Sequence, residues 1–528
     1  MHDVDRNLRD HLLAALTSLP ARREFHLHVL VTAPYKHTSL FPYASPRPRI
    51  YGQDVLVLLS EQPTLDGPRV LVSAIEAALY HIPATSNAIF YVSKVDSTGQ
   101  GIAPPPTATL VTSLIHWYAD PATRPIAAQH LWVHLFARAQ NQYLFPNSSD
   151  HSSKKPLSDV RLCAWWRRIL GKIGADVHRS MHKDGKIKMF YVLPGYNELE
   201  ATQALSLPAS SSDTEPAWMY GHPYSQTDIP LPCPPSPGVP NIGHIIPSFE
   251  DDPKNRFMDE IAFTDNAVAS PVRKRPRTGD KDRDTEKTQE KEKEEVLCAH
   301  GEGDGKNQEA KDPRPKGELG KLGPGEFWER MSFRQECIAG AVTGFFVVGF
   351  SAPPPPTSAG VASSKPVSKA SSTPSPLAPQ PGQVPRAMNK RVLKSLLTGV
   401  EFSTHERAVK ATEIIEGSIR GLCEGLSATA PSSSRPPNSS VQDASGNLLP
   451  ITLPRTPPRI SARLPNVDDV SPNPFDEPEA TLETYYAHIY GTVMVKNAPL
   501  PERTVSTGVA EEPKVNVLAV RKKKKRDA

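Results

Sequence analysis

The sequence predicts a mixed α/β or α+β fold, because apolar periodicities of both kinds recur along the chain. Apolar residues alternate at Phe25, Leu27, Val29 and Val31, as in a half-buried strand. A second group recurs at spacings of three and four, as on one face of a helix: Leu162, Trp165, Trp166, Ile169, Leu170 and Ile173. Stretches rich in proline, serine or charge interrupt these patterns. We therefore expect one folded core with long disordered insertions.

Four helices are expected. The first carries leucines at helical spacing over residues 8–16. The clearest covers residues 159–174, with Ser158 as its N-cap. A third covers residues 388–398 and ends at Gly399, a typical C-cap. A capping box at residues 403–406 opens the fourth, which runs to about 424.

Five strands are expected from runs of branched and aromatic residues bounded by turn residues. They cover residues 25–31, 55–59, 89–92, 130–136 and 186–193. Because strands and helices intersperse in the first half of the chain, the strands are expected to share one core with the helices.

Composition divides the chain into ordered and disordered segments. Proline accounts for 56 of 528 residues and hydrophobic residues for only 38%, so much of the chain cannot offset its ordering entropy by burial. Residues 1–263 are expected to form the core, with 325–351 and a helical pair at 387–425 docking back onto it, because such islands are too small to be stable alone. Three segments are expected to be disordered or linkers: 264–324, 352–386 and 426–480. Residues 481–528 are expected to form a tail.

Charge and cysteine usage argue against several classes of protein. The net charge of +4 gives no overall basic field for nucleic acid. Basic clusters at 273–277 and 521–526 are typical of nuclear localisation signals, although solvated tails have the same composition. The five cysteines include no CxxC pair, which argues against a zinc site and a disulfide framework. Without a secretory pattern or an 18-residue apolar run, the protein is expected to be soluble and nuclear.

Four stretches carry candidate chemistry, and each has a purely structural alternative. In residues 92–99 a strand ends in an acidic residue and a turn of small residues. The N–H groups of such a turn could bind a phosphate or a pantetheine amide, but an ordinary polar turn has the same composition. In residues 136–149, aromatic residues flank a run of amides. Lys154 and Lys155 precede a predicted helix N-terminus. There they could bind a pyrophosphate, because the helix dipole adds to their charge, or they could simply be solvated loop residues. Residues 249–257 contain two adjacent carboxylates before a proline. This pattern is typical of a helix N-terminus, and one of the carboxylates could instead serve as a proton acceptor.

Taken together and in this order, these stretches resemble the fungal-specific histone H3 acetyltransferases of the regulator-of-Ty-transposition type. The most specific pieces are residues 142–146, the Trp165–Trp166 pair and residues 251–257. The resemblance covers the first 263 residues and resumes at 327–351 and 388–424. That family's fold is similar to that of the animal CBP-type acetyltransferases. The resemblance therefore implies a central mixed sheet surrounded by helices.

The resemblance also implies a function. Enzymes of this family use acetyl-CoA, without a metal, to acetylate lysine fifty-six and tail lysines of histone H3. They act on histone H3–H4 with histone chaperones, in replication-coupled nucleosome assembly and the DNA damage response. A non-catalytic chromatin scaffold that binds histones or chaperones is the alternative. A nucleic-acid-binding regulator is disfavoured, because the basic tail lacks interleaved aromatic residues and a DNA-binding motif.

Residue roles follow from the resemblance, position by position. It places nine residues at acetyl-CoA: Val95, Asp96, Ser97, Phe136, Gln140, Lys155, Pro156, Leu157 and Trp165. Tyr143 and Trp166 would line the catalytic face, and Asp252 would be the acid/base. Lys254 matches the lysine that the family acetylates on itself.

The chain departs from the family's pattern at three places. Gln140 stands where a small residue is common. Pro104, Pro105 and Pro106 stiffen a loop that elsewhere in the family reaches the cofactor. The charged insertion after Asn266 is long, and no role is implied for it.

The chemistry of acetyl transfer sets what Asp252 must do. A lysine amine has a pKa near ~10.4, so a base must take its proton before the amine can attack a thioester. Burial, together with the charge of Asp251, is expected to make the Asp252 carboxylate a stronger base than a free aspartate. Positioning of the two reactants is expected to contribute as much.

Overall fold

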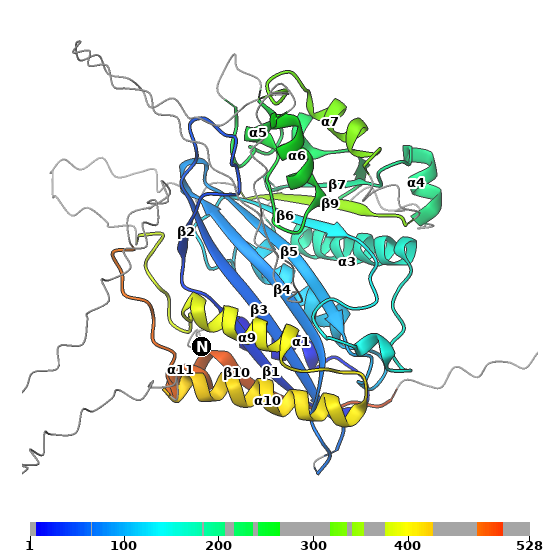
Figure 1. The fold of residues 1–528 in the computed structure, drawn as a ribbon, viewed down its shortest axis with the longest axis vertical. Coiled ribbons are helices and arrows are strands. Elements are labelled where there is room, and N and C mark those ends of the chain that lie inside the picture. The colour runs from blue at the N-terminus through cyan, green and yellow to red at the C-terminus, as the bar shows by residue number, and fades with distance from the viewer. Residues whose placement is uncertain are drawn as a thin grey trace, which may run out of the picture.

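One mixed β-sheet organises the computed structural model, which describes residues 7–64, 66–181, 184–205, 216–235, 241–263, 317–334, 341–352, 375–425 and 473–499 (Figure 1). The strands of this described part are β1 (Arg22–Val31), β2 (Tyr35–His37), β3 (Ile50–Gln62), β4 (Val70–Ile82), β5 (Asn87–Ser97), β6 (His130–Ala137), β7 (Lys186–Val192), β8 (Trp218–Tyr220), β9 (Gly344–Ser351) and β10 (Tyr490–Lys496). Their order is β10-β1-β3-β4-β5-β6-β9-β7-β8, and β2 pairs with β3. The pairs β5–β6 and β7–β8 are parallel, and the others are antiparallel. The predicted central mixed sheet is confirmed.

Helices cover both faces of the sheet, because successive strand residues point to opposite sides. Along β3, Val57 packs in the core under one set of helices, and Leu58 packs in a second core on the opposite face. The first set is α1 (Leu8–Leu16), α2 (Thr107–Ala119), α3 (Asp159–Ser180) and α4 (Glu198–Leu205). The second face carries α9 (Arg386–Thr398) and α10 (His405–Cys423), together with α5 (Ile242–Ile245), α6 (Pro253–Phe263) and α7 (Pro324–Met331).

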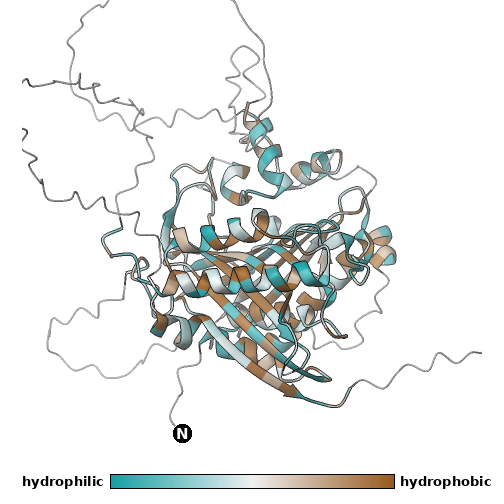
Figure 2. Ribbon diagram, turned by 60° about the horizontal axis from the view of Figure 1, so that its bottom comes forward, coloured by the Kyte–Doolittle hydropathy of each residue, from teal (hydrophilic) through white to brown (hydrophobic). Residues whose placement is uncertain are grey.

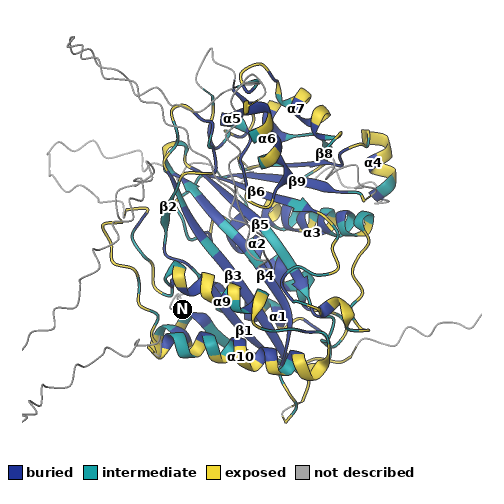
Figure 3. Cartoon of the chain, in the orientation of Figure 1, coloured by how far each residue is buried: buried dark blue, intermediate teal, exposed yellow. Residues whose placement is uncertain are grey.

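Burial follows this layered arrangement. In Figure 3 the strands are mostly dark blue, while the outer turns of α4, α7, α9 and α10 are yellow. Figure 2 shows the matching hydropathy, with brown strands under helices that alternate brown and teal. The outer helices therefore bury one apolar stripe against the core, and this burial is the main stabilising term of the fold.

Most predicted elements are present, with different limits. All five predicted strands form, and the one at 89–92 continues to Ser97. The helix predicted over 159–174 extends to Ser180. The capping box is displaced by one residue, since the N-cap is Thr404, whose hydroxyl accepts from the N–H of Arg407 at 3.3 Å. Ser158 occupies its predicted N-cap position without a side-chain hydrogen bond, and the next residue, Asp159, accepts from the N–H groups of Val160 and Val342.

Several elements were not predicted. No element is predicted for residues 70–82 or 107–119, which form β4 and α2. Residues 481–528 are predicted to be a tail, whereas 482–496 form α11 (Leu482–Thr484), a short π-helix (Tyr485–Ile489) and the edge strand β10. Residues 375–385 also pack onto the core, with Val384 completely buried. The segments expected to be disordered lie largely outside the described residues.

Candidate functional site at the carboxyl ends of β5 and β6

Two parallel strands diverge where the predicted site residues gather. The pairing of β5 with β6 ends at Val92 and Leu135, although β5 continues to Ser97 and β6 to Ala137. A crevice at the carboxyl ends of neighbouring parallel strands is a common ligand site in α/β sheets, because backbone groups there are released from the ladder. This divergence is the framework of the candidate site.

Asp96 organises the loop that follows β6. Its Oδ2 accepts hydrogen bonds from three successive backbone N–H groups, those of Tyr143 at 2.7 Å, Leu144 at 2.8 Å and Phe145 at 3.1 Å. Its Oδ1 accepts from the Ser97 N–H at 2.8 Å and from the Lys154 ammonium at 2.8 Å. All of these partners belong to the protein itself. Asp96 would therefore influence a ligand only indirectly, by fixing the position of the 143–145 loop.

The two lysines before α3 have different environments. The side chain of Lys154 is only 5% exposed, and its ammonium binds Asp96 and, at 2.6 Å, the hydroxyl of Ser148. Lys155 is exposed, and so are Pro156 and Leu157. The expectation of paired lysines at a pyrophosphate therefore does not hold for Lys154, whose charge is neutralised inside the protein. Lys155 is left facing solvent just ahead of the α3 N-terminus.

Tyr143 lies half-buried at the start of this loop. Its hydroxyl donates to the carbonyl of Arg138, which closes the 138–143 turn. Burial raises the pKa of Tyr143 to about 12; the charge of Arg138 opposes this rise and that of Asp96 adds to it. The phenol is therefore protonated at neutral pH, so that Tyr143 is a hydrogen-bonding group and not a base.

The two tryptophans of α3 pack edge to face, with ring centroids 4.7 Å apart. Trp166 is 4% exposed and lies in the core between α3 and the sheet. Trp165 is half-buried and packs at the border of the same core. Trp166 is thus a core residue, and Trp165 is the tryptophan with a surface left for a ligand.

Asp252 and Lys254 form a buried ion pair at the start of α6. Their side chains are 1% and 4% exposed, and the Asp252 Oδ1 also accepts from the backbone N–H of Lys254 at 2.9 Å. The Lys254 ammonium lies over the ring of Phe345, 4.6 Å from its centroid, and 5.7 Å from that of Phe249. Aromatic faces and a carboxylate therefore share the stabilisation of this buried cation.

Asp251, which precedes Asp252, has a partner of its own. Its side chain is 51% exposed and pairs with the ammonium of Lys94 at 3.0 Å. Lys94 also binds Glu76 at 2.9 Å and so ties β4, β5 and the start of α6 together. The cation paired with the Asp252 carboxylate is that of Lys254. Sequence reasoning missed Lys94, although a lysine near the end of a buried strand was the available signal.

The ion pair perturbs the titratable groups beneath it. Burial, followed by the charge of Lys254, lowers the pKa of His134 well below its usual value. Burial, followed by the charge of Asp252, raises the pKa of Tyr91 and of Tyr224. These three side chains therefore stay neutral around the pair at physiological pH, and none was predicted from the sequence.

Phe136 connects the two halves of the site. Its ring packs on Phe345, with centroids 4.7 Å apart, and Phe345 lies under Lys254. Val95 packs against the α1–α3 core on the other face. The predicted residues thus fall into two groups, Trp165, Trp166 and Val95 on one face of the sheet and Phe136 and the 252–254 pair on the other. The pairing of β5 with β6, the strands that carry Val95 and Phe136, ends before these residues, and Gln140 is exposed on the loop.

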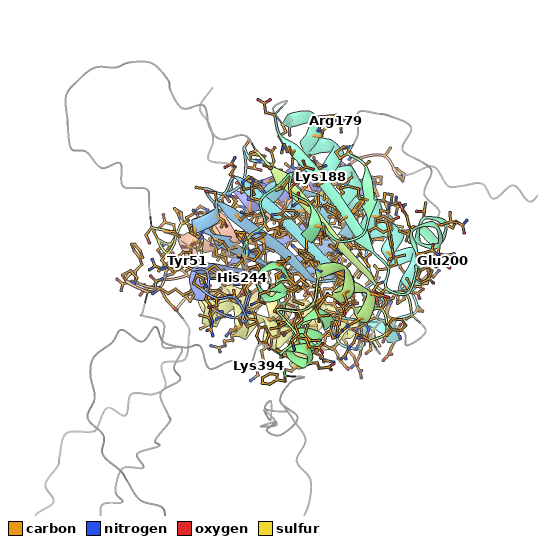
Figure 4. The ribbon with its side chains drawn as sticks, turned by 90° about the horizontal axis from the view of Figure 1, so that it is seen from above. Tyr51, Arg179, Lys188, Glu200, His244 and Lys394 are labelled. Atoms are coloured by element: carbon orange, nitrogen blue, oxygen red, sulfur yellow. The ribbon has the colours of Figure 1, made fainter. Side chains whose placement is uncertain are left out.

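An open cavity of about 700 Å³ lies away from these residues. Its lining includes Arg47, Arg49, Tyr51, Cys233 and His244, and Figure 4 shows Tyr51 and His244 on the same side of the molecule. Within the described residues, no group of three or more histidine, cysteine, aspartate or glutamate side chains could hold a metal ion. No described helix is long and apolar enough to span a bilayer.

Comparison with known proteins relates the whole arrangement to one family. A family model described as the histone acetyltransferase KAT11-type domain matches residues 121–417. The chain is 28% identical over 394 residues to histone acetyltransferase rtt109 of Aspergillus flavus, a match that covers 70% of this chain and 60% of that protein. It is 26% identical over 293 residues to histone acetyltransferase rtt109 of Schizosaccharomyces pombe, covering 56% of this chain and 58% of the relative.

The chain therefore matches less than two thirds of the length of these relatives. Among solved structures, Rtt109 from Aspergillus fumigatus superposes with a TM-score of 0.54 at 23% identity. That likeness covers 78% of this chain and 96% of the other, and it supports the mixed sheet and its helices as a shared fold.

Proposed function

The chain belongs to the KAT11-type histone acetyltransferase family, and from this premise we propose that it transfers the acetyl group of acetyl-CoA to a lysine of histone H3. Lysine fifty-six of H3 is the main target and H3 tail lysines are further ones. The observation that carries the proposal is the divergence of β5 and β6, bordered by the Asp96-held loop and, across Phe136, by the buried Asp252–Lys254 pair.

The residues at the divergence suit the parts of acetyl-CoA. At the end of β5, backbone groups of Val95 and the carbonyl of Ser97 are the proposed partners of the pantetheine amides, since the Ser97 N–H is bound to Asp96. The exposed Lys155 stands before the N-terminus of α3, where cationic side chain and helix dipole both favour a pyrophosphate. Trp165 and Phe136 offer apolar surface, and Gln140, Pro156 and Leu157 lie on the accessible rim.

Acetyl-CoA supplies an activated acyl group as a thioester. The chain's own residues must then place a neutral lysine amine against the carbonyl carbon and accept its proton. Asp252 is the proposed acceptor and Tyr143 shapes the approach of the lysine, while Trp166, whose ring is 4% exposed, acts only by supporting α3 from within the core. In the balanced step the amine nitrogen bonds to the acyl carbon and the amine proton passes to the carboxylate. The carbon–sulfur bond breaks with its electron pair on sulfur, and coenzyme A leaves as a thiolate that is protonated by solvent.

Lys254 controls whether Asp252 is available for this step. As long as its ammonium binds the carboxylate, the proton-accepting oxygen is occupied. Acetylation of Lys254 would convert the ammonium to a neutral amide that no longer neutralises the carboxylate, which would leave the Asp252 oxygen able to accept a proton. We infer that acetyl-Lys254 is the state in which Asp252 serves as the base.

The partners and location of the enzyme follow from its substrate. Histone H3–H4 presented by a histone chaperone is the proposed substrate complex, in nucleosome assembly behind replication and in the response to DNA damage. Nuclear import by the basic clusters at 273–277 and 521–526 accords with this role. Both clusters lie outside the described residues.

Two measurements test the proposal. Acetyl-CoA should raise the unfolding temperature of the protein, as expected for a ligand that binds the native state alone, whereas a non-catalytic scaffold should show no shift. Incubation with acetyl-CoA and an H3–H4–chaperone complex, followed by mass spectrometry, should find acetyl-lysine fifty-six on H3. Absence of both effects would reject the enzymatic assignment in favour of the scaffold.

A further inference from the structure

Arg23 and Glu61 form a buried ion pair at one end of the sheet, outside the site described above. Arg23 lies in β1 and Glu61 in β3, each side chain is at most 1% exposed, and Nη1 and Oε1 are 3.6 Å apart. The guanidinium also lies 5.1 Å from the ring centroid of Phe25. Burying two charges is costly unless further hydrogen bonds stabilise them, so their other partners indicate what the pair does.

Both side chains bind the same stretch of backbone. We call residues 98–106, between β5 and α2, the β5–α2 loop. Arg23 donates to the carbonyl of Ile102 at 2.7 Å and to that of Pro104 at 3.2 Å. Glu61 accepts from the N–H of Ile102 at 3.1 Å. The pair therefore holds both backbone polar groups of Ile102 and one further carbonyl.

The composition of the loop explains why its backbone needs hydrogen-bond partners from these two side chains. Pro104, Pro105 and Pro106 have no N–H groups, so the loop cannot satisfy its carbonyls by pairing with itself as a strand would. Gly101 lies so close to the pair that a Cβ there would be 2.7 Å from Oε2 of Glu61 and 3.0 Å from Val72. The loop is thus packed directly onto the two charges.

The other side of the loop touches the candidate acetyl-CoA site. Gly99 has a φ of +75°, and a Cβ on it would be 2.5 Å from the Cα of Lys154. Thr98 donates to the carbonyl of Leu71 at 2.8 Å, and Gln100 donates to the carbonyl of Phe402 at 3.1 Å. Displacement of the loop would therefore be passed directly to Lys154 and to the Lys155 segment that follows it.

We propose that Arg23 and Glu61 are positioning residues that clamp the β5–α2 loop and so set the place of the Lys154–Lys155 segment for binding of the CoA part of acetyl-CoA. This inference rests on the proposed function. The pair acts through the backbone and touches neither the acyl group nor the substrate lysine. Its contribution should appear in the affinity for acetyl-CoA and not in the chemical step.

The decisive variant replaces both charges, Arg23→Met with Glu61→Met. An apolar pair of similar size often leaves stability unchanged or improves it, but it cannot bind the backbone of Ile102. We expect the unfolding temperature to fall modestly, because the backbone groups of Ile102 lose their partners. The KM and Kd for acetyl-CoA should rise about tenfold, and kcat should change less than about twofold. An unchanged KM and Kd would overturn the proposal, and so would a loss confined to kcat.

A matched control is the Arg386–Asp54 pair at the other end of β3, 3.1 Å apart. Arg386→Met should leave the KM for acetyl-CoA unchanged. If the double variant at 23 and 61 does not fold, Arg23→Lys provides the same test, because it keeps the charge but loses the forked donor that reaches two carbonyls. It should raise the KM in the same sense, and an unchanged KM would count against the clamp.

Hydrogen exchange separates this proposal from the proposed function. The amides of residues 98–103 should exchange faster in the Met–Met variant than in the wild type, whether or not acetyl-CoA binds. If calorimetry shows that the wild type does not bind acetyl-CoA, the proposed acetyltransferase function is rejected. The exchange rates would still show whether Arg23 and Glu61 hold the β5–α2 loop in place. Equal exchange in both proteins would reject the clamp even in an active enzyme.

Discussion

Lys254 and Asp252 form an ion pair at the first turn of α6 in which both side chains are almost completely buried. The cation faces aromatic rings as well as the carboxylate, so neither charge is solvated by bulk water. Removing one member alone leaves the other buried without its partner, which is costly. The pair therefore links the stability of this turn to the proposed chemistry.

Asp252→Asn is predicted to abolish most of the activity. An amide cannot accept the amine proton, and loss of a general base typically lowers kcat by about 100-fold or more. The pH–rate profile should lose the limb in which the rate rises as the base is deprotonated. Asp251→Asn is the control, because Asp251 is half-exposed and bound to Lys94; its kcat should fall less than about threefold. An unchanged profile for Asp252→Asn would exclude Asp252 as the base.

Acetylation of Lys254 is predicted in active enzyme. Mass spectrometry of protein purified from an acetylating host, or incubated with acetyl-CoA, should find the modified lysine. Lys254→Gln, a neutral amide, should retain more activity than Lys254→Arg, because arginine keeps a charge on the Asp252 carboxylate. Persistent absence of acetyl-Lys254 from an active preparation would contradict the proposed release of the base.

Asp96→Ala is predicted to destabilise the protein strongly. The change leaves the Lys154 ammonium and three backbone N–H groups without their acceptor, at a cost of about 3–5 kcal/mol in the free energy of unfolding. Urea denaturation measures this loss. The exposed Asp150 is a suitable control, since Asp150→Ala should change the same free energy by less than about 0.5 kcal/mol. Equal effects of the two variants would show that Asp96 does not organise the loop.

The two tryptophans of α3 should separate stability from ligand binding. Trp166→Ala removes a large side chain from the core and is predicted to cost about 3–5 kcal/mol in unfolding free energy. Trp165→Ala should cost less, because that ring is half-buried, but it should raise the KM for acetyl-CoA. Denaturation and KM are measured for both variants. The assignment is wrong if Trp166→Ala alters the KM and Trp165→Ala does not.

Local periodicity explains how much of the fold could be predicted. The alternation in β1 and the run of large residues in β6 identify strands from neighbours alone. The segment of α2, TATLVTSLIHWYA, is buried between other helices and carries several β-branched residues, so it shows no clear apolar stripe. The alanine-rich β4 is similarly ambiguous. These two elements were missed because tertiary packing, and not local preference, decides their structure.

Long-range pairing limits what the sequence reveals about the site. Arg22 pairs with Lys496 across almost the whole chain, and no local pattern in either strand specifies that partner. The bonds from Asp96 to the 143–145 loop are of the same kind. The residue types of the site could be predicted from a family resemblance. The division between Lys154, which is buried, and Lys155, which is exposed, could come only from three-dimensional contacts.

Two buried histidines are predicted to make the fold sensitive to acid. Burial, followed by the charge of Arg69, lowers the pKa of His26 to about 4 and that of His28 to about 3. His26 is 2.9 Å from the Tyr490 hydroxyl and His28 is 3.1 Å from that of Tyr485. Both tyrosines belong to the C-terminal segment that packs on β1. The neutral histidines therefore help to hold this segment in place.

The sign of the pH effect follows from the lowered values. In the unfolded chain each histidine takes up a proton near pH 6.5, whereas the folded protein resists protonation until about pH 4 or below. Their contribution to stability is thus complete above pH 6.5 and is lost as the pH falls toward 4. At most about 1.4 kcal/mol per pH unit is lost for each histidine.

Urea denaturation at pH 7.5, 6.5 and 5.5 tests this prediction, in a range where most carboxylates remain ionised. The free energy of unfolding should decrease between pH 6.5 and 5.5, and the decrease should be smaller in the variant His26→Gln with His28→Gln. A residual slope is expected from His37 and His134, whose pKa values burial also lowers. Hydrogen exchange of residues 485–496 should increase first on acidification, because their tyrosines face the titrating rings. Identical slopes in the wild type and the double variant would show that this histidine pair does not set the acid limit of the fold.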